Sequence, residues 1–207
     1  MQRLLQTRQW RVSVSEMKKH AILLLMLCAA WASSCKREGS QLEAYVVPTP
    51  DVMVGTGCGD LQATELWVLN RETKQREFVL RGRGDADIEK IIADISDPVF
   101  SLDWKSIYFA SAAWAVSGSI QKVDLKTKQV VFIIDGNSVD MIPRGKHKGM
   151  LLVDRALIKF GKAGESLGRD SYLWLVSANG KPLFEIGLSG GPEDIKFRAE
   201  HLRKTKG

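Results

Sequence analysis

Residues 55–60, Gly-Thr-Gly-Cys-Gly-Asp, form the segment of this chain whose residue types come closest to a reactive site. A glycine-rich loop can present backbone N–H groups to a phosphate, and an exposed cysteine can act as a nucleophile. The phosphate-binding fingerprints require a following helix at fixed spacing, which is absent here. A cysteine nucleophile needs a base, but His147 and His201 lie in no recognisable motif. We therefore interpret the segment as a hairpin loop, and catalysis through Cys58 is the alternative.

Carboxylates alternate at Asp85, Asp87 and Glu89, as they do at the start of a calcium-binding loop. An EF-hand loop needs Gly at its sixth position and Glu at its twelfth, where this chain has Lys90 and Ser96. Four isoleucines in the same stretch recur at helical spacing, so residues 85–96 are predicted to form one short amphipathic helix capped by the carboxylates. The sequence therefore predicts no metal site and no cofactor.

Large aromatic residues are the other candidates for function. Trp104 and Trp114 fall in predicted loops, where a large apolar ring is less expected than in a strand. Such rings stack on sugars or anchor a protein or peptide partner, so both residues are predicted binding candidates. Trp174 lies in a predicted strand and is assigned to the core. The chain has no zinc-ligand spacing, no Ser-His-Asp order and no paired catalytic carboxylates, so it is predicted not to be an enzyme.

The first 34 residues have the features of a secretory signal peptide. Lys18 and Lys19 precede an apolar run over residues 21–32. A secretory apolar region spans about 7–15 residues, whereas a membrane-spanning helix needs about 20. Met17 stands directly before the basic pair, where a signal peptide begins, so it is a candidate for the true start of translation.

The end of this leader resembles the cleavage site of bacterial lipoproteins. Residues 32–35 read Ala-Ser-Ser-Cys, and in that family the cysteine becomes the lipid-modified first residue. The resemblance implies a lipid on Cys35, a polar tether over residues 35–41, and an outer-membrane location facing the periplasm, because Lys36 replaces the retention signal Asp. The alternative is cleavage after Ala32 in the Ala-Trp-Ala sequence, which would release a soluble periplasmic protein.

The net charge of +6 is concentrated at the chain ends. Residues 1–34 carry five basic residues and one acidic residue, and residues 196–207 carry the same numbers. The remainder is nearly balanced and has no basic stripe with interleaved aromatic residues, so nucleic acid is excluded as a partner. Hydrophobic residues at 44% and charged residues at 26% are ordinary for a globular domain.

The body of the chain repeats at an offset of 54 residues. Thr73-Lys74-Gln75 matches Thr127-Lys128-Gln129, and the runs that follow share phenylalanine, aliphatic residues and a final glycine. A looser third copy covers residues 173–187 and contains Asn179-Gly180, a strong hairpin signal. Short β-rich runs between such turns predict antiparallel hairpins, and units of about 40–50 residues are typical of propeller blades. The predicted domain covers residues 42–207, with units at 42–82, 97–136 and 137–187.

Residues 97–109, Asp-Pro-Val-Phe-Ser-Leu-Asp-Trp-Lys-Ser-Ile-Tyr-Phe, resemble the repeat of TolB-type β-propellers. The resemblance is best over residues 97–136 and implies a fold without implying an activity. We therefore expect an all-β fold of antiparallel four-stranded, blade-like repeats, in an incomplete or small propeller-like arrangement with one short helix. A β-sandwich or an open stack of sheets is the alternative. Residues 45–47 and 195–197 are candidate strands for a further unit.

These observations predict a non-catalytic lipoprotein of the cell envelope with a binding or scaffold role. Loops on a rigid sheet scaffold would hold an envelope protein, a peptide or a glycan, and the lipid would supply the membrane contact. The alternative is a small periplasmic enzyme that uses the glycine-rich loop around Cys58.

Overall fold

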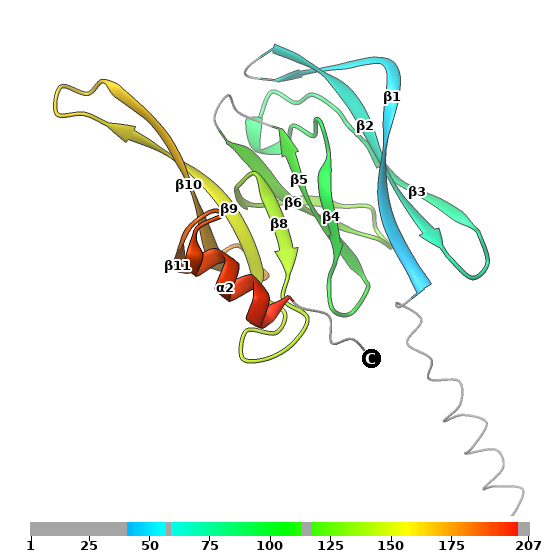
Figure 1. Ribbon diagram of the computed structural model, residues 1–207. Coiled ribbons are helices and arrows are strands. Elements are labelled where there is room, and N and C mark those ends of the chain that lie inside the picture. The colour runs from blue at the N-terminus through cyan, green and yellow to red at the C-terminus, as the bar shows by residue number, and fades with distance from the viewer. Residues whose placement is uncertain (1–40, 57–58, 113–116, 203–207) are drawn as a thin grey trace, which may run out of the picture. The chain divides into compact units, whose positions relative to one another are not determined.

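The computed structural model describes residues 41–56, 59–112 and 117–202, and these residues form three antiparallel sheets and one α-helix (Figure 1). The first sheet has the order β1 (Leu42–Thr56), β2 (Gly59–Asn70), β3 (Arg76–Arg81). The middle sheet has the order β4 (Ser96–Phe100), β5 (Ser106–Ala112), β6 (Gly118–Asp124), β7 (Val130–Asp135). The third sheet runs β8 (Ser138–Met141), β9 (Leu151–Phe160), β10 (Ser166–Val176), β11 (Pro182–Leu188). The predicted all-β class is confirmed.

The 54-residue repeat is visible in two equivalent turns. The side-chain Oδ1 of Asn70 accepts hydrogen bonds from the N–H groups two and three residues later, at 2.9 and 3.0 Å. Asp124 makes the same two contacts at 3.0 and 2.7 Å. Lys74 and Lys128 then take left-handed φ angles of 60° and 58°. The same residue types therefore build the same turn twice, and the predicted repeat is confirmed.

Two hydrophobic clusters join the three sheets in series. The first cluster packs Leu66 and Leu80 of the first sheet against Ile107 and Phe109 of the middle sheet. The second cluster joins the middle and third sheets and contains Tyr108, Ala110, Ile120, Ile134, Val139, Met141, Leu151, Val153 and Val176. Strand alternation explains this arrangement, because successive side chains of β5 point to opposite faces of its sheet. Among the described residues, no core cluster joins the first sheet to the third.

The first sheet has three strands rather than the predicted four. The turn hydrogen bond from Arg71 N to Gln41 O, at 2.8 Å, matches the one from Leu125 N to Lys105 O, at 2.9 Å. β1 is therefore the equivalent of β5, since each strand begins directly after the carbonyl in this bond. β5 pairs with β4 on its other edge, whereas β1 pairs only with β2. In the described part of the chain, the first sheet lacks the strand that corresponds to β4 and β8.

The helix predicted over residues 85–96 is wrong. Only the single 3-10 turn η2 (Ile88–Lys90) forms there, although the carboxylates act as predicted, since Asp87 Oδ1 accepts the N–H of Glu89 at 3.1 Å. The isoleucines of this segment are divided between two clusters: Ile92 and Ile95 belong to the first core cluster, while Ile91 packs beside Val54 and Ala63. Their spacing reflects burial of an irregular segment on two sides and not a helical face.

The helix of this domain lies instead near its end. Helix α2 (Pro192–His201) contains residues 195–197, which were predicted as a strand, so that prediction is also wrong. Pro192 at the first helical position and two acidic residues in the first turn favour a helix start. The helix packs on the third sheet, where Phe197 contacts a cluster that includes Leu173 and Leu175. Figure 1 shows α2 in front of the strands of this sheet.

Candidate functional site

Of the four residues proposed from the sequence, Trp104 is the one that the structure describes. Cys35, Cys58 and Trp114 lie outside the described residues. Trp104 lies in the turn between β4 and β5 with φ of 61°, half-buried, and its ring packs on Phe100 with centroids 4.7 Å apart. The contact holds Trp104 against its own sheet and leaves part of the ring accessible.

Trp174 lies in β10 and packs against the second core cluster, with the guanidinium of Arg155 over its ring at 5.3 Å. Its Nε1 is buried without a hydrogen-bond partner in the described structure. Arg155 in turn bonds Asp135 at 2.7 Å, which ties β9 to the end of β7. This tryptophan therefore serves the packing of the third sheet on the middle one.

A row of aromatic side chains crosses the outer face of the first sheet, meaning the face turned away from the middle sheet. Tyr45 is paired in register with Trp67, and Trp67 is paired with Phe78. Residues paired directly across antiparallel strands share a face, and the alternate residues of β2, Leu66 and Val68, lie in the first core cluster. This aromatic row of Tyr45, Trp67 and Phe78 thus points away from the core. Trp67 is half-buried, and Phe78 is 44% exposed.

A carboxylate fixes the central ring of the row. Glu65 Oε2 accepts the indole N–H of Trp67 at 2.8 Å, while Glu65 Oε1 accepts from Arg81 at 2.5 and 2.8 Å. The guanidinium of Arg81, followed by the indole N–H, holds the pKa of the Glu65 carboxyl below its usual range. Phe78 meets Trp67 edge to face, with centroids 5.4 Å apart at 73°. Both rings are therefore held in place by contacts within the first sheet.

The equivalent face of the middle sheet is covered by other parts of the chain. Phe109 pairs with Gln121 in register as Tyr45 pairs with Trp67, and Phe109 lies in the first core cluster, under the first sheet. Gln121 is 1% exposed and donates to Ile91 O at 2.7 Å. In the middle sheet this face is therefore covered by polypeptide, whereas no described element packs on the aromatic row.

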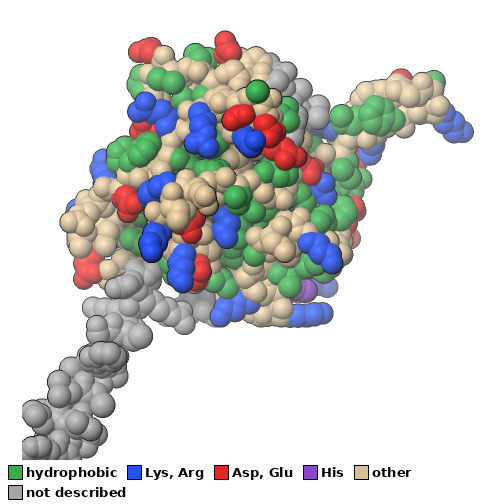
Figure 2. All heavy atoms as spheres, turned by 180° about the vertical axis from the view of Figure 1, so that it is seen from behind, with side chains coloured by type: hydrophobic (Ala, Val, Ile, Leu, Met, Phe, Trp, Pro, Cys, Tyr) green, Lys and Arg blue, Asp and Glu red, His purple; other side chains and the backbone are tan. Residues whose placement is uncertain are grey.

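A second exposed apolar surface lies on the long hairpin of β9 and β10. Phe160 is 65% exposed and Leu167 is 63% exposed. Figure 2 shows this hairpin projecting from the packed sheets with hydrophobic side chains near its tip. An ion pair between Lys159 and Asp170 crosses the two strands below the tip. The surface is apolar but has no ordered aromatic row.

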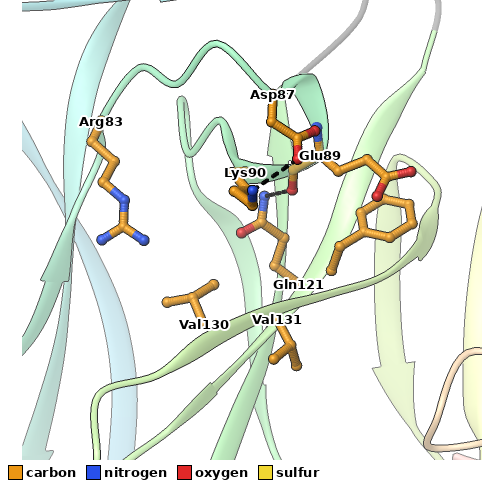
Figure 3. A pocket seen from close by; sticks show the side chains of 8 residues that line it. Arg83, Asp87, Glu89, Lys90, Gln121, Val130 and Val131 are labelled. Carbon is orange, nitrogen blue, oxygen red and sulfur yellow. Dashed lines mark hydrogen bonds and ion pairs between the residues drawn. The ribbon is translucent and has the colours of Figure 1, made fainter.

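A cavity of about 270 Å³ lies between the segment after β3 and strands β6 and β7 of the middle sheet (Figure 3). Figure 3 shows Arg83 reaching in from one side and the residues of η2 from the other. Lys90 and Asp87 form an ion pair at 3.0 Å on this rim. The full lining consists of Arg83, Asp87, Glu89, Lys90, Gln121, Val130, Val131 and Phe132. Because cations and carboxylates share the rim, the cavity has no single charge preference.

The two histidines that follow the leader lie together at the end of α2, whose last residue is His201, with ring centroids 5.5 Å apart. His201 stacks on Phe197 at 4.1 Å, and His147 contacts Phe184. Burial, then Lys146 and His201, lowers the pKa of His147. Within residues 41–56, 59–112 and 117–202, no group of three or more His, Cys, Asp or Glu is placed to hold a metal ion. The helices of these same residues include none long and apolar enough to cross a membrane.

Reasoning from the sequence missed the aromatic row because its members are far apart in the chain. Tyr45, Trp67 and Phe78 each fall in a strand, where a ring is expected in the core. Only the pairing register of three strands shows that they share the uncovered face. The one available signal was the contrast between Trp67 and Gln121, which occupy the same position of the 54-residue repeat.

No family model matches this chain, and no curated protein matches it. Among solved structures it is similar to the β-propeller domain of the Trilobed protease from Pyrococcus furiosus, with 20% identity and a TM-score of 0.42 over 70% of this chain and 38% of that one. It is also similar to the acylaminoacyl peptidase of Pyrococcus horikoshii, with 18% identity and a TM-score of 0.44 over 71% of this chain and 24% of that one. This chain therefore spans well under half of these proteins, and the similarity assigns it no family and no activity.

Proposed function

We propose that this chain is a non-catalytic binding protein of the cell envelope that holds a protein partner on the aromatic row of its first sheet. Its leader would direct export, and a lipid on Cys35 would attach it to the periplasmic face of the outer membrane. The single observation that carries the binding role is the row itself, three aromatic side chains in register on a face that no described element covers.

The geometry of the row favours a protein over a glycan. A flat sugar platform needs rings that lie in one plane, but Trp67 and Phe78 are inclined at 73°. The indole N–H, which could bond a sugar hydroxyl, is already donated to Glu65. Charged side chains, among them Glu65 and Arg81, border the rings, and aromatic residues within a polar rim are typical of protein–protein interfaces.

Site-specific photo-crosslinking in intact cells tests this role. A photoreactive amino acid at Phe78 should link to one discrete protein, identifiable by mass spectrometry, and Trp67→Ala should abolish that product. Val131, a 50% exposed residue of β7, is the matched position and should not give the same product. Equal products from both positions, or a product that survives Trp67→Ala, would contradict a specific site on the first sheet.

The anchoring step has its own test. Cys35→Ala removes the acylation site and should move the protein from the membrane fraction to the soluble periplasm. Mass spectrometry of the purified protein should find lipid on Cys35. Unchanged fractionation together with an unmodified cysteine would show that the chain is not a lipoprotein, and it would leave the binding role of the first sheet to be judged on the crosslinking alone.

A further inference from the structure

The first sheet has an open edge at the place where the other two sheets each carry a strand. β4 lies beside β5, and β8 lies beside β9. β1 is the equivalent of β5, yet the sheet ends at β1 in the described part of the chain. An open edge presents a row of unpaired backbone N–H and C=O groups, which is a template for another strand.

The register identifies which backbone groups form this edge. In an antiparallel pair, hydrogen-bonded positions alternate with positions whose backbone points the other way. Arg71 N bonds Gln41 O at 2.8 Å, so the backbone of Leu42, Ala44 and Val46 points away from β2. In the middle sheet the equivalent groups are used: Ser106 O accepts from Ser101 N at 2.9 Å.

We propose that an extended segment of another polypeptide adds to the edge of β1 as an antiparallel strand. The molecule contains two filled examples of this position, since β4 and β8 are each antiparallel to their neighbour. This inference shares with the proposed function only that the ligand is a polypeptide. It concerns the edge of the first sheet and not its outer face.

The two filled examples also define the chemistry of the added segment. β4 has five residues and β8 has four, so a short segment is sufficient. Val139 and Met141 of β8 are buried in the second core cluster, at alternate positions. Leu42, Ala44 and Val46 pack against the first core cluster, so alternate apolar side chains on the added strand would extend that cluster. Pro48 offers no N–H and limits the site to the start of β1.

Selection of extended peptides against the full chain tests this proposal. The probe is a displayed library of random octapeptides, and binding of selected synthetic peptides is measured by fluorescence anisotropy. We expect peptides with alternating apolar residues that slow amide exchange at Leu42, Ala44 and Val46. Ala44→Pro removes one edge N–H without breaking a bond to β2, and it should weaken binding about tenfold or more. The control variant Val131→Ala, at an exposed position of the middle sheet, should leave binding within about twofold.

Methylation of alternate peptide nitrogens keeps the protein unchanged and should also abolish binding, which guards against misfolding of the proline variant. If no selected peptide binds Ala44→Pro more weakly than it binds the natural chain, the inference is wrong. Loss of binding in Trp67→Ala but not in Ala44→Pro would assign the peptides to the aromatic row. A dimer that Ala44→Pro dissociates would make a second copy of β1 the occupant. Amides at the edge that are already protected in the free chain would show that its own residues cover the site.

Discussion

The outer faces of the first and third sheets are the two ends of the stack, and they differ in whether a described element covers them. On the third sheet, Leu173 and Leu175 are 0% exposed in a cluster packed beneath α2. On the first sheet, the aromatic row is accessible, and α2, the α-helix of the described residues, lies on the other end. In the described residues the stack does not close, so two faces have no neighbouring sheet, and a described element covers one of them.

The covered and uncovered faces also differ in their residue types. The covered face is aliphatic, and α2 is held on it by Arg198, which bonds Asp194 within the helix and Asp140 of β8, both at 2.5 Å. The uncovered face has tyrosine, tryptophan and phenylalanine beside the Glu65–Arg81 ion pair. Aliphatic side chains offer water no polar group, whereas tyrosine and tryptophan carry one that can stay solvated at a surface. The difference in residue types supports the proposal that a partner covers the aromatic face.

The largest expected effect is on the covered face. Leu173→Ala should lower the free energy of unfolding by about 2–5 kcal/mol, because it leaves a cavity under α2. For a domain of this size, that corresponds to a fall of several degrees in the melting temperature. Thermal and denaturant unfolding measure it. An effect no larger than that of a substitution in the aromatic row would break the comparison between the two ends.

The attachment of the helix should have the next largest effect. Asp194 is buried, and its carboxylate accepts from Gly190 N at 2.7 Å as well as from Arg198. Asp194→Ala removes the acceptor of the buried Gly190 N–H and leaves Arg198 with Asp140 alone, and it should cost about 1–3 kcal/mol. Hydrogen exchange should increase in α2 and in the strands beneath it. Substitution of the neighbouring exposed residue, Glu193→Ala, is the control. An equal loss of stability in that variant would show that the buried carboxylate of Asp194 does not hold the helix in place.

The sequence was sufficient to predict features that depend on local chemistry. The turns after Asn70 and Asp124 and the hairpin at Asn179-Gly180 follow from side chains that bond their own backbone and from residues that accept positive φ. Residues 85–96 could not be predicted in this way, because their isoleucines are placed by two separate clusters. Helix α2 was missed because Asp194 is its one buried residue, so it has no apolar stripe.

The aromatic row depends on information that no local pattern contains. Its three members become neighbours only through the register of β1, β2 and β3, which includes an irregularity between Leu66 and Trp67. A shift of one residue in a strand would reverse the face of every side chain in it. The same holds for the open edge, since the missing fourth strand is recognised only by comparing the pairing of β1 with that of β5.

The uncovered face should respond weakly in stability. Phe78→Ala removes a ring that is nearly half exposed and should cost less than about 1 kcal/mol. The melting temperature should therefore change by no more than about 2–4 °C. With the photoreactive amino acid moved to Tyr45, the same variant should lose the partner crosslink expected at this face. A large loss of stability would mean that Phe78 supports the fold, and the face would then resemble the covered end.

The smallest expected effect is a difference between the two ends in how their contribution to stability depends on pH. Burial, Lys146 and His201 lower the pKa of His147 in the folded chain, so the unfolded chain, with a histidine pKa of about 6.5, takes up the proton first. The stability that this histidine contributes is present above about pH 6.5 and is lost as the pH falls through its folded value. On the first sheet, Glu65 has a lowered pKa, so its contribution persists until the pH falls below about 4.3.

The melting temperature should therefore fall slightly between pH 7.5 and pH 5, and His147→Gln should reduce that fall, while Glu65→Gln should leave it unchanged. His201 and every acidic residue except Glu65 are the same in both variants, and Glu65, with its lowered pKa, stays ionised between pH 7.5 and pH 5, so the difference between the variants isolates His147. The direction follows from linkage, because stability decreases wherever the unfolded state binds more protons as the pH falls. An identical pH profile for His147→Gln and the natural chain would show that the covered end is no more sensitive to mild acid than the aromatic one.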